Sequence, residues 1–142
     1  MKLYRTIGEG ELFKILNNSK IEGQYNCSTE KQNDVNCDNV VCFYLDENFK
    51  WKDSRHKFEI VINVNNFQKG EGIYYVSDNV IKTGVWSGRR GKQTLKVKEA
   101  YIKEYNASMV CEIRLYDHFS NSYANYLKEY VEGRFPHIKF TR

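Results

Sequence analysis

The residue of this sequence best placed to do chemistry is Glu99. It lies in segment 94–102, where apolar residues alternate with lysines, and this alternation predicts a strand. Glu99 falls on the apolar side, where a carboxylate costs on the order of several kcal/mol unless it is paired or lines a cleft. We therefore expect Glu99 to be catalytic. The alternatives are a structural ion pair, with Arg5 or Arg114 as partner, and a register that turns Glu99 outward.

A strongly basic segment includes this strand and the turn before it. Residues 82–103 hold seven Lys or Arg residues and one Glu, a net charge of +6, whereas the whole chain carries +4. Such concentrated charge favours an acidic protein surface or nucleic acid as partner. Glycines flank the centre of the segment and predict a hairpin tip, where we expect four partner-binding residues: Trp86, Arg89, Arg90 and Lys92. The alternatives are a solvated turn, and a Trp86 that belongs to the core.

The sequence holds no recognisable metal or phosphate-binding motif. Its four cysteines form no CxxC pair, and its three histidines show no HxxxH or HExxH spacing, so we expect no metal site. No serine lies in a GxSxG motif, and no GxxxxGK[ST] motif occurs. Cys42 and Cys111 are expected to be small buried apolar residues.

Length and composition predict a single domain over residues 1–142. No apolar run reaches the roughly 18 residues that a membrane span needs, and the N-terminal stretch does not resemble a signal peptide. We expect a cytoplasmic protein of a bacterium or of a phage-infected host cell. The abundance of Lys, Asn and Tyr fits an AT-rich phage or bacterial genome.

Hydrophobic patterning predicts two helices among several strands. The first helix lies within 10–20, and the second begins at Asp117 or Ser120 and ends at Gly133. Strands are predicted at 2–6, 39–45, 57–64, 73–76, 83–87, 94–102, 109–116 and 137–141. The strand at 57–64 alternates and is expected to be half-buried. Because helices and strands do not alternate, we expect an α+β fold, with a mainly antiparallel sheet of about six to eight strands and two helices.

Five short stretches resemble, in their order, the motifs of one family. They are Leu3-Tyr4-Arg5, 11–16, 20–23, 40–46 and 97–99. The order is similar to that of ADP-ribosyltransferase-like domains, which have a strand of the LYR type, a short helix, a "kI.G" segment, a "vvSfTrD" strand and a late ExE strand. In this sequence Cys42 and Tyr44 stand where the family has Ser and Thr, and Val97 stands where it has the first Glu.

The resemblance implies that NAD or an ADP-ribose-like nucleotide is the ligand. Arg5 would then contact the phosphates or ribose, Tyr44 would lie at the cofactor, and Glu99 would stabilise an oxocarbenium-like charge. The sequence leaves open whether the protein is an enzyme. The alternative is a non-enzymatic inhibitor of the phage type, which docks its basic hairpin at 82–103 onto an acidic protein surface or nucleic acid.

Overall fold

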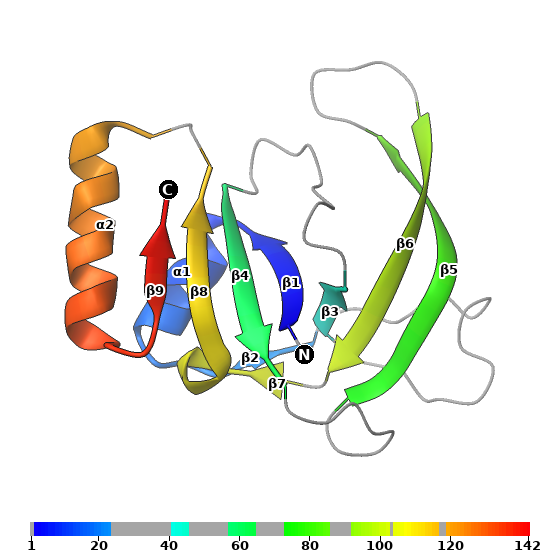
Figure 1. The fold of residues 1–142 in the computed structure, drawn as a ribbon, viewed down its shortest axis with the longest axis horizontal. Helices are drawn as coiled ribbons and strands as arrows, with labels where there is room; N and C mark the ends of the chain where they lie inside the picture. Colours follow the sequence, from blue (N-terminus) through cyan, green and yellow to red (C-terminus); the bar gives the residue numbers. More distant parts are fainter. Residues whose placement is uncertain are drawn as a thin grey trace.

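The computed structural model describes residues 2–23, 41–45, 57–64, 73–85, 92–102, 104–116 and 119–142, with only the backbone described at 73–85, 92–99 and 101. Within these residues the chain forms a large sheet, a small sheet and two α-helices (Figure 1). The helices are α1 (Glu9–Leu16) and α2 (Asn121–Arg134). A short 3-10 turn, Ala107–Met109, precedes β8.

The large sheet has the strand order β5-β6-β3-β1-β4-β8-β9. Its strands are β1 (Lys2–Ile7), β3 (Val41–Tyr44), β4 (Phe58–Asn63), β5 (Ile73–Val85), β6 (Lys92–Ile102), β8 (Val110–Leu115) and β9 (Lys139–Thr141). All neighbours are antiparallel except β8 and β9, which run parallel. A second sheet pairs β2 (Ile21–Glu22) with β7 (Glu104–Tyr105).

The α+β class with two helices is therefore confirmed, and the large sheet is mainly antiparallel as expected, but it is mixed because β8 and β9 pair in parallel. The reason is α2, which carries the chain from the end of β8 back to the start of β9 and so allows parallel pairing. The second sheet was not predicted, because two-residue strands carry no periodic signal.

Strand β4 lies between β1 and β8 and is buried on both faces. Phe58, Ile60 and Ile62 are fully buried, as expected, but Glu59 and Val61 are also at most 1% exposed. The prediction of a half-buried strand was wrong, because alternation cannot reveal what packs on the second face.

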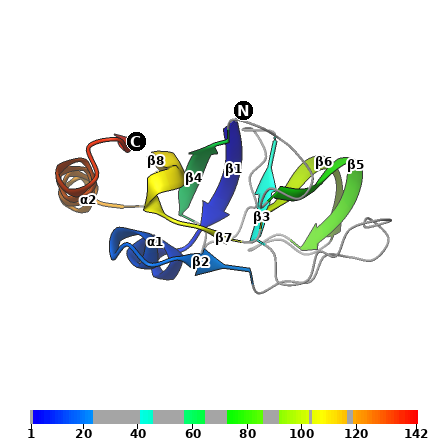
Figure 2. The same cartoon turned by 90° about the horizontal axis from the view of Figure 1, so that it is seen from below.

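Helix α1 packs its apolar side against one face of the sheet. Leu12, Ile15 and Leu16 are buried with Leu3 and Ile7 of β1, and each fully buried side chain contributes about 1.5–3 kcal/mol. The helix ends at Leu16 with Asn17 as its C-cap, and Asn18 follows with a φ of 60°, a left-handed conformation that Asn tolerates. Figure 2 shows α1 and the small sheet on the same side of the large sheet.

Helix α2 lies beside β9 at one end of the sheet (Figures 1 and 2). The hydroxyl of Ser120 accepts a hydrogen bond from the amide of Tyr123, so Ser120 rather than Asp117 caps the helix. Ala124, Leu127 and Val131 bury its inner side. The helix continues one residue past Gly133, the predicted end.

Strands β5 and β6 form a long two-stranded ribbon at the opposite end. The sequence predicted two short strands at 73–76 and 83–87, but β5 is continuous over 13 residues. Its pairing with β6 shifts register between Ser77 and Val80, in the polar stretch that separates the two predicted strands. Only residues 99–102 of β6 pair with β3, so in the described chain 92–97 pair with β5 alone. The ribbon thus extends beyond the body of the sheet (Figure 1).

Candidate functional site

Arg5 is held by an ion pair on the helix-bearing face of the sheet. Because side chains alternate along β1, Arg5 shares the face of Leu3 and Ile7 and meets α1. Its Nε and Nη2 atoms donate to the two carboxylate oxygens of Glu11 at 2.9 and 2.8 Å. The hydroxyl of Tyr105, in β7, donates to the same carboxylate. We call Arg5, Glu11 and Tyr105 the Arg5 cluster.

The electrostatics of the Arg5 cluster favour a fixed, charged arginine. Burial alone would lower the pKa of Arg5, but the hydrogen bonds and charge of Glu11 outweigh it and raise that pKa. Burial, followed by the charge of Glu11, raises the pKa of Tyr105 well above its ordinary value. Tyr105 therefore stays protonated and remains a donor to Glu11.

Arg5 also links β1 to β3. Its Nη1 atom donates to the carbonyl oxygen of Cys42 at 3.1 Å. In the described ladder, β1 and β3 share one residue pair, Tyr4 with Tyr44. The guanidinium of Arg5 thus adds a side-chain connection where the backbone pairing between the two strands is short.

The register places the predicted cofactor and catalytic positions on adjacent strands. Glu99 of β6 is paired with Tyr44 of β3, and Tyr44 is paired with Tyr4 of β1. Arg5 lies one residue further along β1, so its side chain is on the helix-bearing face, opposite to that of Tyr4. Tyr4 and Tyr44 are only 9% and 6% exposed. Three segments that lie far apart in the sequence therefore meet in one cross-strand row, which we call the Glu99–Tyr44–Tyr4 row.

Both arginines that could be structural partners of Glu99 form ion pairs with other carboxylates. Arg5 is paired with Glu11, and Arg114 is paired with two other carboxylates. The side chain of Glu99 lies outside the described part, so its catalytic role stays a prediction.

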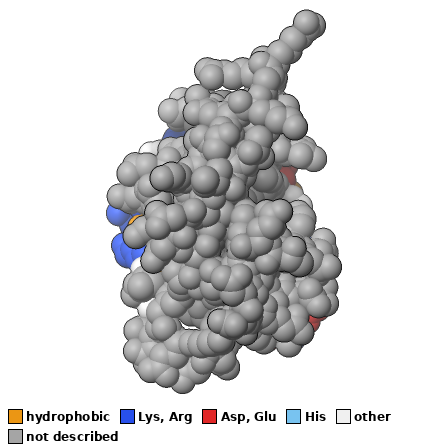
Figure 3. Space-filling view, turned by 90° about the vertical axis from the view of Figure 1, so that its right-hand side faces the viewer, with side chains coloured by type: hydrophobic (Ala, Val, Ile, Leu, Met, Phe, Trp, Pro, Cys, Tyr) orange, Lys and Arg blue, Asp and Glu red, His pale blue; other side chains and the backbone are white. Residues whose placement is uncertain are grey.

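The predicted partner-binding tip lies mostly outside the described residues. This holds for Trp86, Arg89 and Arg90, whereas Lys92 is the first residue of β6 and its backbone pairs with Val85. Figure 3 views the molecule from the β5 side, and the described Lys and Arg side chains visible there lie along one flank. The binding role of the tip stays a prediction.

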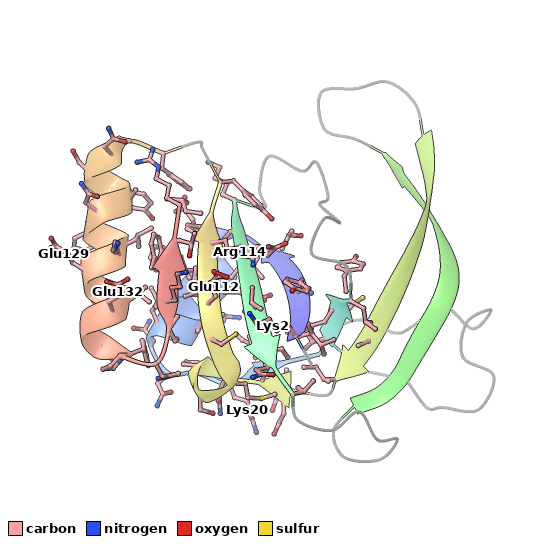
Figure 4. All side chains as sticks on the ribbon, in the orientation of Figure 1. Lys2, Lys20, Glu112, Arg114, Glu129 and Glu132 are labelled. Carbon is pink, nitrogen blue, oxygen red and sulfur yellow. The ribbon has the colours of Figure 1, made fainter. Side chains whose placement is uncertain are left out.

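A second polar cluster, which the sequence did not suggest, lies on the face opposite α1. Arg114 of β8 donates from Nη1 to Glu59 and from Nε to Glu112, each at 2.9 Å. Thr141 of β9 donates to the other oxygen of Glu112 at 3.0 Å, and the guanidinium lies 5.5 Å from the ring centre of Tyr4. We call these five residues the Arg114 cluster. Figure 4 labels Arg114 and Glu112 along β8.

The cluster follows from cross-strand register. Glu59 is directly opposite Arg114, and Glu112 is directly opposite Val61 on one side and Lys139 on the other. Opposite charges at facing positions stabilise a pair of strands. The sequence shows Glu59 and Arg114 in two predicted strands. Their pairing could be predicted only by knowing that β4 and β8 are neighbours in the sheet.

Ion pairing decides the charge states within the cluster. Burial would lower the pKa of Arg114, but its bonds to Glu112 and Glu59 raise it. Burial would raise the pKa of Glu112, but hydrogen bonds from Arg114 and Thr141 lower it. Burial and the charge of Glu59 raise the pKa of Tyr116. Glu112 is therefore ionised, and the neighbouring Tyr116 is neutral, at physiological pH.

Cys42 and Cys111 are free thiols, both half-buried rather than fully buried as expected. Among the described residues no group of three or more His, Cys, Asp or Glu side chains could hold a metal ion. No helix in that part of the chain is long and apolar enough to cross a membrane.

Comparisons with protein-family models, with curated proteins and with solved structures found no match. A proposal of function therefore rests on the residues and on their places in the fold. The two places that combine charge, burial and convergence of distant segments are the Arg5 cluster with its neighbouring row and the Arg114 cluster.

We expect Arg114→Met to lower the free energy of unfolding by about 3–5 kcal/mol, because it leaves the Glu59 carboxylate, which is 1% exposed, without its cation. The double variant Glu59→Leu/Arg114→Met should recover part of that loss, since the fully buried Glu59 charge is removed while Glu112 keeps its bond from Thr141. Urea denaturation measures both. Arg134→Met, on the exposed side of α2, is the matched control and should stay within about 0.5 kcal/mol of wild type. A loss in Arg114→Met no larger than in this control would contradict the role of the ion pair.

We expect Glu112 to make the protein acid-sensitive. Its pKa is lower in the folded chain than its ordinary value of 4.5, so its stabilising effect is complete above pH 4.5 and is lost as the pH falls below it. Glu112→Gln should therefore show a shallower loss of unfolding free energy between neutral and acid pH than wild type. Glu129→Gln, exposed on α2, is the control. Equal pH slopes for Glu112→Gln and wild type would show that the pairing does not act in solution.

Proposed function

We propose that the protein binds NAD or an ADP-ribose-like nucleotide where β6, β3 and β1 meet. The observation that supports this function best is the Glu99–Tyr44–Tyr4 row. Arg5 follows Tyr4 on β1 but lies on the other face of the sheet, so a ligand that meets both would have to reach across the β1–β3 junction. The stretches that resemble ADP-ribosyltransferase-like domains are far apart in the sequence, and the fold brings three of them onto adjacent strands. If the similarity of these short stretches were due to chance, nothing would require them to lie on neighbouring strands.

Each residue of this place has a chemical role that suits such a ligand. Arg5 is a permanent cation that can donate hydrogen bonds to a diphosphate, the geometry that guanidinium groups prefer. Tyr44 and Tyr4 are 6% and 9% exposed, so only a small part of each side chain is open to a ligand. Glu99 would stabilise the positive charge that develops on the ribose when the bond to nicotinamide breaks, which is the chemistry that NAD supplies.

We expect the wild-type protein to bind NAD and ADP-ribose in calorimetry. Arg5→Lys keeps the charge but loses the fork of donors, so the affinity for both should fall about tenfold. Glu99→Gln should keep binding but lose transfer of labelled ADP-ribose to lysate proteins and hydrolysis of NAD, by a factor on the order of 100 or more.

Arg134→Lys and Glu129→Gln, both on the exposed side of α2, are the matched controls and should behave as wild type. If wild-type protein shows no binding, no label transfer and no hydrolysis, the proposed function is wrong. Binding without either reaction would identify a nucleotide-binding protein that is not an enzyme.

A second candidate function is favoured by the shape of the β5–β6 ribbon. The ribbon extends beyond β3 and carries the segment whose net charge is +6. A projecting basic ribbon suits a non-enzymatic protein that docks onto an acidic protein surface or nucleic acid, as a phage-type inhibitor would. Arg89, Arg90, Lys92 and Trp86 are the residues that would make this contact.

We expect Arg89→Glu/Arg90→Glu to abolish capture of such a partner and to remove the salt dependence of binding, because the charge at the tip reverses. Pull-downs from host lysate and titration with random-sequence DNA at two salt concentrations measure this. Lys128→Glu/Arg134→Glu, on exposed positions of α2, changes the net charge equally and is the control. Unchanged capture in the tip variant would rule out this function.

A further inference from the structure

The outer side of α2 presents aromatic side chains to solvent. Tyr126 is 60% exposed, the more open of the two large apolar side chains that are exposed in the described chain. Its ring centre lies 6.2 Å from that of Tyr130, whose hydroxyl accepts a hydrogen bond from Arg134 at 3.4 Å. Helix α2 is the outermost element at its end of the sheet (Figures 1 and 2), so its outer side is accessible to a partner.

Gly133 lies on the same side of α2 and is also open. A spacing of seven residues is close to two helical turns, so Tyr126 and Gly133 are about 10 Å apart along one side of the helix. Glycine weakens a helix, and a left-handed φ does not explain this one. Crowding does not explain it either, because a Cβ built on Gly133 would meet no atom within 4 Å. We call Tyr126, Tyr130 and Gly133 the α2 surface.

The two ends of the α2 surface carry opposite charges. Arg134 lies at its C-terminal end, next to Tyr130. At the N-terminal end lies Tyr123, whose pKa is raised by burial and then by the charge of Glu9. The Glu9 carboxylate of α1 is therefore close to this end. A surface with a cation at one end and an anion at the other is complementary to a reversed copy of itself.

We propose that the α2 surface pairs with the same surface of a second copy of this chain, as an antiparallel dimer whose two-fold axis passes midway between Tyr126 and Gly133. Tyr126 of each copy then packs over Gly133 of the other, and symmetry makes both contacts form together. The same arrangement brings Arg134 of each copy toward Glu9 of the other. This inference goes beyond the proposed nucleotide-binding function and does not depend on it.

The expected dimer is small and weak. Each copy contributes one helix of 14 residues, which is about 21 Å long, so the contact area lies at the low end for specific interfaces. Glu129 of both copies would lie near the two-fold axis at the outer rim, where like charges repel each other. We therefore expect a Kd on the order of 10 µM.

Sedimentation velocity of the full chain, from about one-tenth to ten times this Kd, tests the proposal. Wild type should change from the mass of one chain to that of two as its concentration rises. Tyr126→Glu should stay monomeric, and Tyr126→Ser serves if Tyr126→Glu does not fold. Gly133→Leu should weaken association about tenfold or more, yet raise the thermal midpoint of the dilute monomer, because leucine favours a helix.

Charge reversal tests the antiparallel orientation. Arg134→Glu and Glu9→Lys should each weaken association about tenfold, and Glu9→Lys/Arg134→Glu should recover to within about threefold of wild type. Lys128→Glu, on the opposite side of α2, makes the same charge change as Arg134→Glu and should behave as wild type. Arg134 is exposed in a single chain, so its substitution alters association and not the folding of dilute protein.

Three results would overturn the proposal. The first is a wild type that stays monomeric at every concentration. The second is a dimer that the Tyr126 variants leave intact, which would place self-association elsewhere on the chain. The third is a double charge variant that associates no better than its single variants, which would exclude the antiparallel orientation.

Discussion

The ion pair between Arg5 and Glu11 is the contact through which the two sheets and the first helix meet. Arg5 comes from β1, Glu11 from α1, the Cys42 carbonyl from β3 and the Tyr105 hydroxyl from β7. A cation that is 17% exposed needs partners on several sides; α1 and β3 supply them directly, and β7 supports Glu11 through Tyr105. Removing any one of these elements would leave a charged group poorly solvated, so their positions are mutually dependent.

Each face of the large sheet holds a partly buried arginine that is paired with carboxylates, but the number of carboxylates differs. On the helix-bearing face one carboxylate balances Arg5, whereas on the other face Arg114 is shared between Glu59 and Glu112. Arg114 therefore serves mainly to neutralise buried acid, and its ring contact with Tyr4 packs it against the neighbouring strand. Arg5, with a single carboxylate and a backbone partner, is the better candidate for an additional ligand.

Sequence patterns predicted the parts that depend on near neighbours along the chain. The alternation of β1, the apolar side of α1 and the Ser120 cap were all legible, because each needs only residues within about one helical turn. The burial of Glu59 could not be predicted from the sequence, because it depends on the pairing of β4 with both β1 and β8. The partners of Arg114 were hidden for the same reason, since they depend on strand order, whereas Glu11 is only six residues from Arg5 and meets it because α1 packs on β1.

The place of β1 in the sheet has a consequence for folding. This strand comes first in the chain, yet it lies between β3 and β4, and its pairing with β4 joins Lys2 to Asn63. Closing so long a loop loses chain entropy before any contact compensates, whereas β8, α2 and β9 are close neighbours in the sequence. The β3–β6 and β4–β8 pairings close loops of similar length, so we expect all three long-range pairings to follow the local unit of β8, α2 and β9. The β1–β3 junction, with Arg5 in it, therefore depends on long-range pairing and not on local structure.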